Sequence, residues 1–485
     1  MAIEVADIQQ SKAKTYFFPF LNGIRGISSL YVVFHHLIAD GIASLSTSPR
    51  YLFFLRFGHE AVVFFIVLSG FVLTLPLVNL VEKKFPDGLG GFIMRRARRI
   101  LPAYYVALLF LPIFFLAVEL LKAVTGEGAN MIRLQELFLS SSLFSHLLLL
   151  QNLKSDWISR PEYNLVLWSM ATEWWIYFIF ALLLVPIWRK IGIFAALAFS
   201  VLLGLVPLGM HLLGYQSLLG SPHLLGSFGL GMFTAVLIGR KDLAEKYKLW
   251  QRWFSWIAVL AVVVFLLIVL IAPGIREDPY YQSITDLLLS IACAAFIFAI
   301  APIELKIQKP GALSVLSLKI LESRPALFLG KISYSLYLTH LVFYAALGIT
   351  LNLKPVQKIA LLSIEPIWVR VFLVIPLLVL LAYFFYLFFE KPFLNIPALA
   401  KAKAIIEKKP IPTSLNPRTN RHGAFTKIHH LRVARSRAVS SSVAMLTPQK
   451  MYLHVRRPGL KYHGQSRNIR SDPDMSRTKT KRRLL

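Results

Sequence analysis

Three ionisable side chains interrupt stretches of the sequence that are otherwise apolar. Arg25 and His36 lie in the first such stretch, and Glu173 lies in a later one. An imidazole can act as a general base on a hydroxyl, a guanidinium can hold a phosphate or a developing negative charge, and a carboxylate can orient or balance either of them. Ionisable groups are costly inside a membrane span and usually mark a functional site. We therefore expect Arg25, His36 and Glu173 to form a catalytic group.

The spacing of Arg25 and His36 places them on one face of a helix. They are eleven residues apart, which in an α-helix leaves them within about 20° of each other and roughly 16 Å apart along the axis. His35 points about 100° away from His36. Two plainer interpretations stay open: Arg25 could extend to the membrane interface as a topology signal, and His36 could form a hydrogen bond between helices.

Glu173 shares a helix face with two hydroxyl side chains. Ser169, Glu173 and Tyr177 follow an i, i+4, i+8 spacing. A carboxylate within a span needs a partner, and a histidine or an arginine is the obvious one. We expect Ser169 and Tyr177 to contact substrate beside Glu173, with a structural ion pair as the alternative role of the carboxylate.

Four arginines precede a further apolar stretch, between Met94 and Tyr105. Simple topogenesis would account for this charge. Guanidinium groups also bind phosphate in bidentate geometry, so Arg96 and Arg99, just before Pro102, are our candidate phosphate clamp.

Two more segments place polar residues inside apolar stretches. Tyr337 and His340 lie one turn apart near the C-terminal end of the apolar region, and we expect them to contact substrate, with hydrogen-bonded helix packing as the alternative. Ser69 and Gly70 stand within another stretch, where small residues mostly allow close packing and a nucleophilic Ser69 is the lesser possibility. The pair His35-His36 cannot chelate an ion from one helix face, and we expect no metal site.

The composition of the chain indicates whether these polar residues lie in a soluble protein or in a membrane protein. The chain has 485 residues, of which 56% are hydrophobic and 16% charged, with a mean hydropathy of +0.62. A soluble surface of this size would need more charge, so most of the surface must face lipid. The net charge of +29 fits anionic lipid and positive cytoplasmic loops better than nucleic acid. The single cysteine, Cys293, excludes an internal disulfide.

Runs of about 20 apolar residues predict an all-α, polytopic bundle of about ten spans. The stretch 191–239 reads as two spans, because Gly214 and Pro222 mark a short loop within it. The predicted spans, in chain order, are 17–38, 61–81, 100–118, 163–188, two within 191–239, 253–275, 287–303, 332–353 and 371–389.

The basic clusters predict the topology. They all fall on one side only if residues 137–150 do not cross the membrane, so we expect a re-entrant or interfacial helix there and both chain ends in the cytoplasm. We divide the chain into a cytoplasmic segment 1–17, a membrane domain 18–393 and a basic cytoplasmic tail 394–485. That tail has 21 Lys and Arg against 3 Asp and Glu, a composition typical of disordered or lipid-associated segments.

Together these segments resemble the acyltransferase-3 family of polytopic membrane proteins, which includes bacterial O-antigen and other glycan O-acetylases. The resemblance covers about Phe18 to Phe393. Six motifs, each weak alone, occur in the family's order: Leu21-Asn-Gly-Ile-Arg-Gly26 with His36, Phe64-Phe-Ile-Val-Leu-Ser-Gly-Phe71, Arg96-Ala-Arg-Arg-Ile-Leu-Pro-Ala-Tyr104, Trp168-Ser-Met-Ala-Thr-Glu173 with Tyr177, Gly330-Lys-Ile-Ser-Tyr-Ser-Leu-Tyr-Leu-Thr-His340 and Glu390-Lys-Pro392. Asn22 and Met170 depart from the residues common at their positions, and neither change should abolish the chemistry.

The resemblance implies transfer of an acyl group, commonly acetyl, from cytoplasmic acyl-CoA to a hydroxyl acceptor presented outside, in a cell membrane. His36 would be the general base, with a covalent acyl-histidine as a variant, and Arg96 and Arg99 would anchor the CoA phosphates. Some family members carry an extra hydrolase-like domain; since none follows the last span here, we expect direct transfer or a separate partner. The acceptor could be a carbohydrate, a lipid, a peptide or a small molecule.

A transporter is the alternative from another functional class. In a proton-coupled transporter or flippase, His36 and Glu173 would relay protons and Arg25 would be a counter-ion for the substrate. Such proteins usually show two similar halves, and this sequence shows no such symmetry.

Overall fold

The computed structural model describes most of the apolar region of the chain. The chain separates into two units, Met1–Leu394 and Asn395–Leu485, and the second lies outside the described residues. The expectations for segment 1–17 and for the basic tail beyond Leu394 therefore concern residues that the structure does not describe. The described residues are 18–39, 54–78, 80, 83–125, 141–153, 166–214, 222–239, 247–271, 281–304, 311–351 and 367–394.

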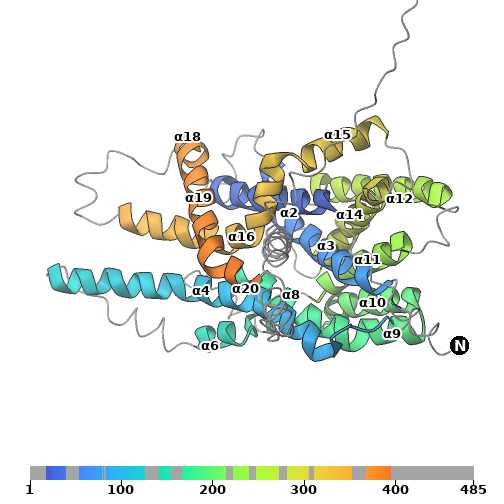
Figure 1. Ribbon diagram of the computed structural model, residues 1–485, viewed down its shortest axis with the longest axis horizontal. Coiled ribbons are helices and arrows are strands. Elements are labelled where there is room, and N and C mark those ends of the chain that lie inside the picture. Colours follow the sequence, from blue (N-terminus) through green and yellow to red (C-terminus); the bar gives the residue numbers. More distant parts are fainter. Residues whose placement is uncertain are drawn as a thin grey trace, which may run out of the picture. The chain divides into compact units, whose positions relative to one another are not determined.

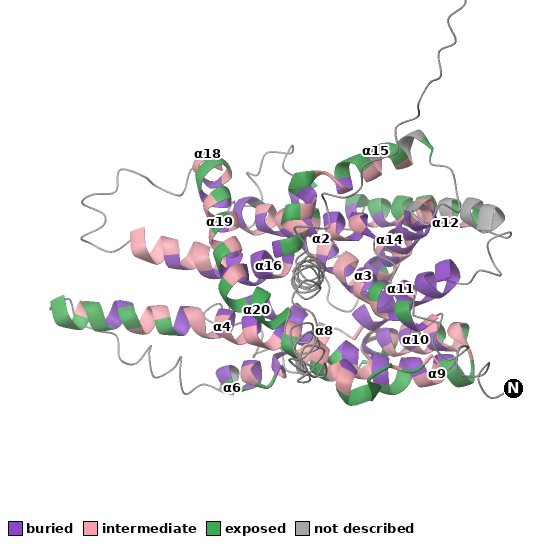
Figure 2. Ribbon diagram, in the orientation of Figure 1, coloured by how far each residue is buried: buried purple, intermediate pink, exposed green. Residues whose placement is uncertain are grey.

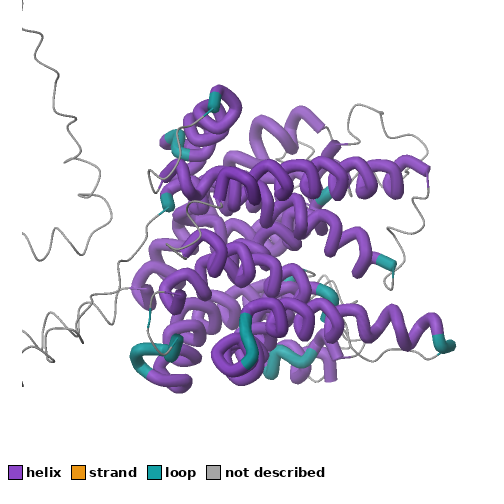
Figure 3. Tube along the Cα trace, turned by 90° about the vertical axis from the view of Figure 1, so that its right-hand side faces the viewer, coloured by secondary structure: helices purple, strands orange, loops and turns teal. Residues whose placement is uncertain are grey.

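Every regular element in these ranges is a helix, and none of them is a strand (Figures 1 and 3). The first half of the chain contributes α2 (Pro19–Phe34), η1 (His35–Ala39), α3 (Gly58–Val78), α4 (Gly88–Thr125), α6 (Ser141–Leu147), η3 (Gln151–Leu153), α8 (Leu167–Ile179), η5 (Phe180–Leu184), α9 (Val185–Lys190), α10 (Ile193–Leu212) and α11 (Leu224–Gly239). The second half contributes α12 (Tyr247–Ile271), α14 (Gln282–Glu304), α15 (Ala312–Leu321), α16 (Arg324–Leu351), α18 (Ile367–Val369), η7 (Arg370–Val374), α19 (Ile375–Phe385), η8 (Tyr386–Glu390) and α20 (Lys391–Leu394).

These helices account for about ten membrane spans. Among the described residues, seven helical segments are long and apolar enough to cross a bilayer: α3, α4, α8 to α9, α10, α14, α16, and α18 to α20. The shorter apolar segments Leu224–Gly239 and Trp256–Ile271 correspond to two further predicted spans, and α2 with η1 corresponds to the first. Helix α6 has 7 residues, which is too short to cross, so the prediction for residues 137–150 fits the part of that segment that the structure describes.

Contacts between helices agree with spans that alternate in direction. In that case the odd-numbered spans should run parallel to one another, and so should the even-numbered spans. The first and ninth, α2 and α16, are parallel: Gly26 meets the backbone of Gly330, and about three turns further along both helices His36 stacks on His340. The third span, α4, also runs parallel to α16, since Tyr334 contacts the carbonyl of Ile100 and Phe343 contacts Phe110 further along.

The even-numbered spans show the same agreement. Helices α3 and α11 are the second and sixth spans, and Gly231 lies against Val67 while Gly239 lies against Val78, so the two are parallel. Helix α2 is antiparallel to α3, because Phe18 packs on Phe71 at one end and His35 lies against Gly58 at the other.

Close backbone approach explains the glycine that follows Arg25 and the glycine opposite it on α16. A Cβ added at Gly26 would lie 2.4 Å from the nitrogen of Gly330, and one added at Gly330 would lie 2.1 Å from the oxygen of Asn22. The backbones of α2 and α16 are therefore in contact, which is how helices commonly associate in lipid. This contact fixes Arg25 relative to Tyr334 and Tyr337 on α16.

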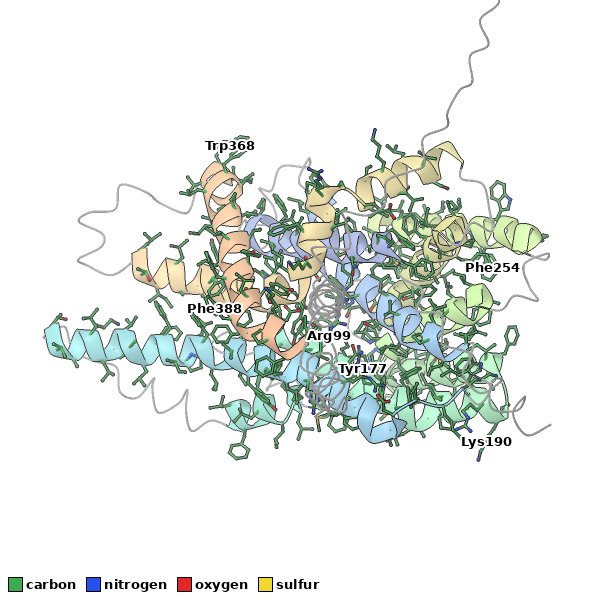
Figure 4. The ribbon with its side chains drawn as sticks, in the orientation of Figure 1. Arg99, Tyr177, Lys190, Phe254, Trp368 and Phe388 are labelled. Atoms are coloured by element: carbon green, nitrogen blue, oxygen red, sulfur yellow. The ribbon has the colours of Figure 1, made fainter. Side chains whose placement is uncertain are left out.

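Burial separates inner helices from a lipid-facing surface (Figure 2). In α11 every residue except Leu230 is buried. By contrast Trp368 is 70% exposed, Phe388 is 66% exposed and Trp256 is 64% exposed, and Figure 4 shows Trp368 at the outer end of the last span. Large apolar side chains cost nothing against hydrocarbon, so this surface fits a multi-pass membrane protein.

Candidate active site

Two adjoining cavities lie among α2, α3, α4, α8 and α16. They enclose about 470 Å³ and 510 Å³ of empty space, including the parts open to solvent. We name them the serine-tyrosine cavity and the arginine cavity. The first is lined by Arg25, Val62, Phe65, Ile66, Ser69, Ser169, Met170, Glu173, Ser333, Tyr334 and Tyr337. The second is lined by Leu21, Arg25, Leu68, Ser69, Val72, Leu73, Arg96, Arg99, Ile100, Glu173, Tyr177 and Tyr334.

The arginine cavity carries an excess of positive charge. Its lining contains three guanidinium groups, from Arg25, Arg96 and Arg99, and one carboxylate, from Glu173. The balance is three minus one, or +2. Figure 4 shows Arg99 and Tyr177, which come from different helices, close together in the middle of the view, whereas Lys190 lies at its edge. A cavity with this balance favours an anionic ligand.

The structure sorts the arginines of α4 into two groups. Arg95 pairs with Asp87 in the turn before the helix, and Arg98 is exposed. Arg96 and Arg99, at i and i+3, face the arginine cavity. The Nε atom of Arg96 is buried and has no hydrogen-bond partner in the described part of the chain. A buried donor without a partner is costly, and an anion in this cavity would satisfy it.

Glu173 is held by two hydroxyl groups. Ser69 Oγ donates to Glu173 Oε1 over 2.7 Å, and the hydroxyl of Tyr177 donates to the same oxygen. Tyr177 lies one turn further along the helix, on the face that the i, i+4 spacing predicts. The partner we expected for this carboxylate was a histidine or an arginine; its hydrogen bonds go to hydroxyls, while arginines line the same cavity.

Ser169 and Tyr337 join α8 to α16. Their hydroxyl oxygens are 2.7 Å apart, and Ser169 Oγ also donates to the carbonyl of Val166 over 3.0 Å. The ring of Tyr337 packs edge-on against Phe65, with centroids 6.2 Å apart. Both hydroxyl-bearing residues line the serine-tyrosine cavity, although 168 residues separate them in the sequence.

His36 lies beside His340 and is absent from the lining of either cavity. The two imidazole rings are stacked, with centroids 5.3 Å apart and an angle of 27°. His36 is partly exposed at the π-helical turn η1, and π-helical turns frequently occur at functional sites. Arg25 and His36 therefore occupy two different parts of the region, as their separation along the helix predicts.

The hydrogen bonds of His340 indicate its tautomer. Its Nδ1 lies 2.9 Å from the carbonyl oxygen of Tyr337 and 3.1 Å from that of Leu336. Carbonyl oxygens only accept, so Nδ1 carries the proton and Nε2 keeps a lone pair. That Nε2 is buried and has no hydrogen-bond partner among the described residues. The His340 ring lies 6.1 Å from Tyr337, so the histidine pair adjoins the serine-tyrosine cavity through Tyr337.

Three residues of this region have a larger part than the sequence suggested. Ser69 binds Glu173, while Gly70 supplies the close packing, since a Cβ there would lie 2.1 Å from the oxygen of Phe228. Tyr334 lines both cavities and was not singled out. Glu390 is buried and accepts a hydrogen bond from Ser335 over 2.5 Å; its only signal was its place in a short motif.

Comparison with known proteins supports one family. The family model described as Acyltransferase domain matches residues 18–387, which is more than half of the chain. No curated protein and no solved structure shows significant similarity to it.

Proposed function

The chain belongs to the acyltransferase-3 family and is a membrane acyltransferase, and from this premise we propose that it moves an acyl group, preferably acetyl, from acyl-CoA to a hydroxyl of a carbohydrate or related acceptor. The charge of the arginine cavity carries this proposal. Its lining has a balance of +2, and CoA brings phosphates that guanidinium groups bind as bidentate partners.

The two cavities suggest how the donor would lie. Arg96 and Arg99 would hold its phosphates, and Arg25, which lines both cavities, would hold the phosphate nearest the serine-tyrosine cavity. Since the cavities share four residues, the thioester arm would extend past Ser69 toward Ser169 and Tyr337. We assign the end of the bundle with Arg95 and Lys190 to the cytoplasm, following the positive-inside rule.

His36 would be the general base of the transfer. It would take the proton from the acceptor hydroxyl as that oxygen attacks the thioester carbonyl. The carbon–sulfur bond then breaks, and the CoA thiolate leaves and takes the proton back from the imidazolium. His340 would orient His36 through the stacked rings, and Tyr337 and Ser169 would position the thioester. A covalent acyl-histidine at His36 is a variant of the same scheme.

Labelled acetyl-CoA tests the proposal. Membranes with matched amounts of the wild type, His36→Ala, His36→Gln and the control His211→Gln would be incubated with it, and label would be followed into glycan, lipid and small-molecule fractions. We expect label with the wild type and the control and none with the His36 variants. Full labelling by both His36 variants would refute the role of the base. No label in any fraction, with acetyl-CoA or longer CoA esters, would refute the donor.

A further inference from the structure

A second group of polar side chains lies outside both cavities. His59 at the start of α3, His223 just before α11 and Asp286 near the start of α14 converge at one end of the bundle. His59 Nε2 lies 2.8 Å from Asp286 Oδ2, and His223 Nε2 lies 3.0 Å from the same oxygen. All three potential ligand atoms lie within 4.8 Å of one another.

This group is buried on most sides. The side chain of Asp286 is 2% exposed, that of His223 is 7% exposed and that of His59 is 20% exposed. Buried charges in proteins are paired or coordinate metals, so the carboxylate requires the two imidazoles or an ion held between them. The greater exposure of His59 leaves one side from which an ion could enter.

Both imidazoles lie close to the same carboxylate oxygen. His59 Nε2 makes a hydrogen bond with Asp286 Oδ2. His223 Nε2 lies 3.0 Å from that oxygen, and this contact falls short of the hydrogen bond that His59 makes. Two imidazole nitrogens beside one buried carboxylate oxygen are placed to share an ion with it.

The donor atoms identify the class of ion. Two imidazole nitrogens and one carboxylate oxygen suit Zn²⁺ and other divalent transition metals, whereas Mg²⁺ and Ca²⁺ prefer oxygen ligands. Metal–ligand bonds of about 2.0–2.2 Å in a tetrahedron place ligand atoms about 3.3 Å apart. The two distances to Asp286 are a few tenths of an ångström below this spacing. The two imidazole nitrogens, which lie within 4.8 Å of each other, would move closer together around the ion. Three protein ligands leave a fourth position for water or another oxygen.

The surrounding residues hold these side chains in place. The ring of Trp168 stacks on His59 with centroids 5.8 Å apart and an angle of 9°. Ser290 Oγ donates to the carbonyl of Asp286 over 2.6 Å and lies 2.8 Å from Ser227 Oγ, which ties α11 to α14 within about a turn of the cluster. Ring contacts and hydrogen bonds around metal ligands fix the orientation of those ligands.

We propose that His59, His223 and Asp286 bind one divalent transition-metal ion, with Zn²⁺ as the expected species. The site is formed by α3, by the turn before α11 and by α14, which are distant from one another in the sequence. Our expectation of no metal rested on sequence patterns such as the His35-His36 pair, which do not show residues that converge from distant segments. This proposal rests on the cluster alone and does not depend on the identity of the acyl donor or acceptor.

Elemental analysis of the purified chain tests the site. The full chain, isolated in detergent with an affinity tag that contains no histidine, would be dialysed against micromolar Zn²⁺ and then against buffer. We expect about one zinc per chain for the wild type and for the control His211→Gln, whose ring lies 6.0 Å from Tyr281. Asp286→Asn and His223→Gln should bind zinc at least about tenfold more weakly. Equal zinc in all four proteins would overturn the proposal.

A second measurement uses only the unsubstituted protein, so it does not depend on how the variants fold. Titration of the zinc-free wild type with Co²⁺ should produce visible absorption bands of a four- or five-coordinate site that saturate at one equivalent. Zn²⁺ should abolish them, and Mg²⁺ should not. A wild type without such bands, and without retained zinc, would overturn the assignment.

Discussion

Arg96 is the residue at which the charge of the arginine cavity can be tested most directly. Replacing it by Met keeps an unbranched side chain and removes the guanidinium. A hydrogen bond to a charged group contributes about 1.5–3 kcal/mol, and about 1.4 kcal/mol corresponds to a tenfold change in affinity. We therefore expect Arg96→Met to weaken the binding of CoA by about 10- to 150-fold.

The same substitution should not lower stability. It removes a cation–π contact in which the Arg96 guanidinium lies 6.0 Å from the centroid of the Phe92 ring, which contributes about 0.5–1 kcal/mol. It also removes the buried Nε that lacks a hydrogen-bond partner among the described residues. An unpaired buried donor costs the wild type about 1–3 kcal/mol, and the substitution removes this cost. The second effect is at least as large as the first, so the free energy of unfolding should stay constant or rise.

The assay is equilibrium binding of labelled acetyl-CoA to the purified protein, together with the thermal midpoint of each variant. The matched control is Arg98→Met, which removes an exposed guanidinium from the same segment and should change the dissociation constant by less than about twofold. Weaker binding by Arg98→Met to the same extent would mean that the cluster acts only through its general charge. Unchanged binding by Arg96→Met would refute the phosphate site.

Two further substitutions test the position of Glu173 and the packing of α2 on α16. Ser69→Ala removes the 2.7 Å hydrogen bond to Glu173 and should lower kcat/KM about 10- to 150-fold at an unchanged thermal midpoint. The control Ser200→Ala should leave acyl transfer unchanged. A fully active Ser69→Ala enzyme would contradict the role of this bond. Gly330→Ala places a Cβ 2.1 Å from the oxygen of Asn22, and the overpacking should lower the free energy of unfolding by about 1–3 kcal/mol. The control Gly209→Ala, with open space around its Cβ, should not destabilise the protein. Equal thermal midpoints for the two variants would refute the close contact.

The spans and the polar face of each helix could be predicted from the sequence. Length and charge locate a span because the bilayer imposes both. Helical spacing likewise placed Glu173 and Tyr177 on one face, and they share a hydrogen bond. These predictions depend only on residues within one helix.

Contacts between distant helices could not be predicted in this way. His36 stacks on His340 and Ser169 bonds Tyr337, but nothing in the apolar pattern of α2 or α8 indicates which helix is its neighbour. In lipid, small residues and close backbone packing decide that choice. Sequence reasoning also understated Ser69, because a serine beside a glycine within a span usually serves packing.

Charge in the arginine cavity has a consequence for turnover. Free CoA retains every phosphate of its thioester, so the three guanidinium groups that line this cavity would hold the spent carrier as firmly as the loaded one. Free CoA should then be a competitive product inhibitor, and its release should limit the rate once acceptor is abundant. Added salt screens such charges, so moderate ionic strength should raise the maximal rate even as it weakens capture of the donor.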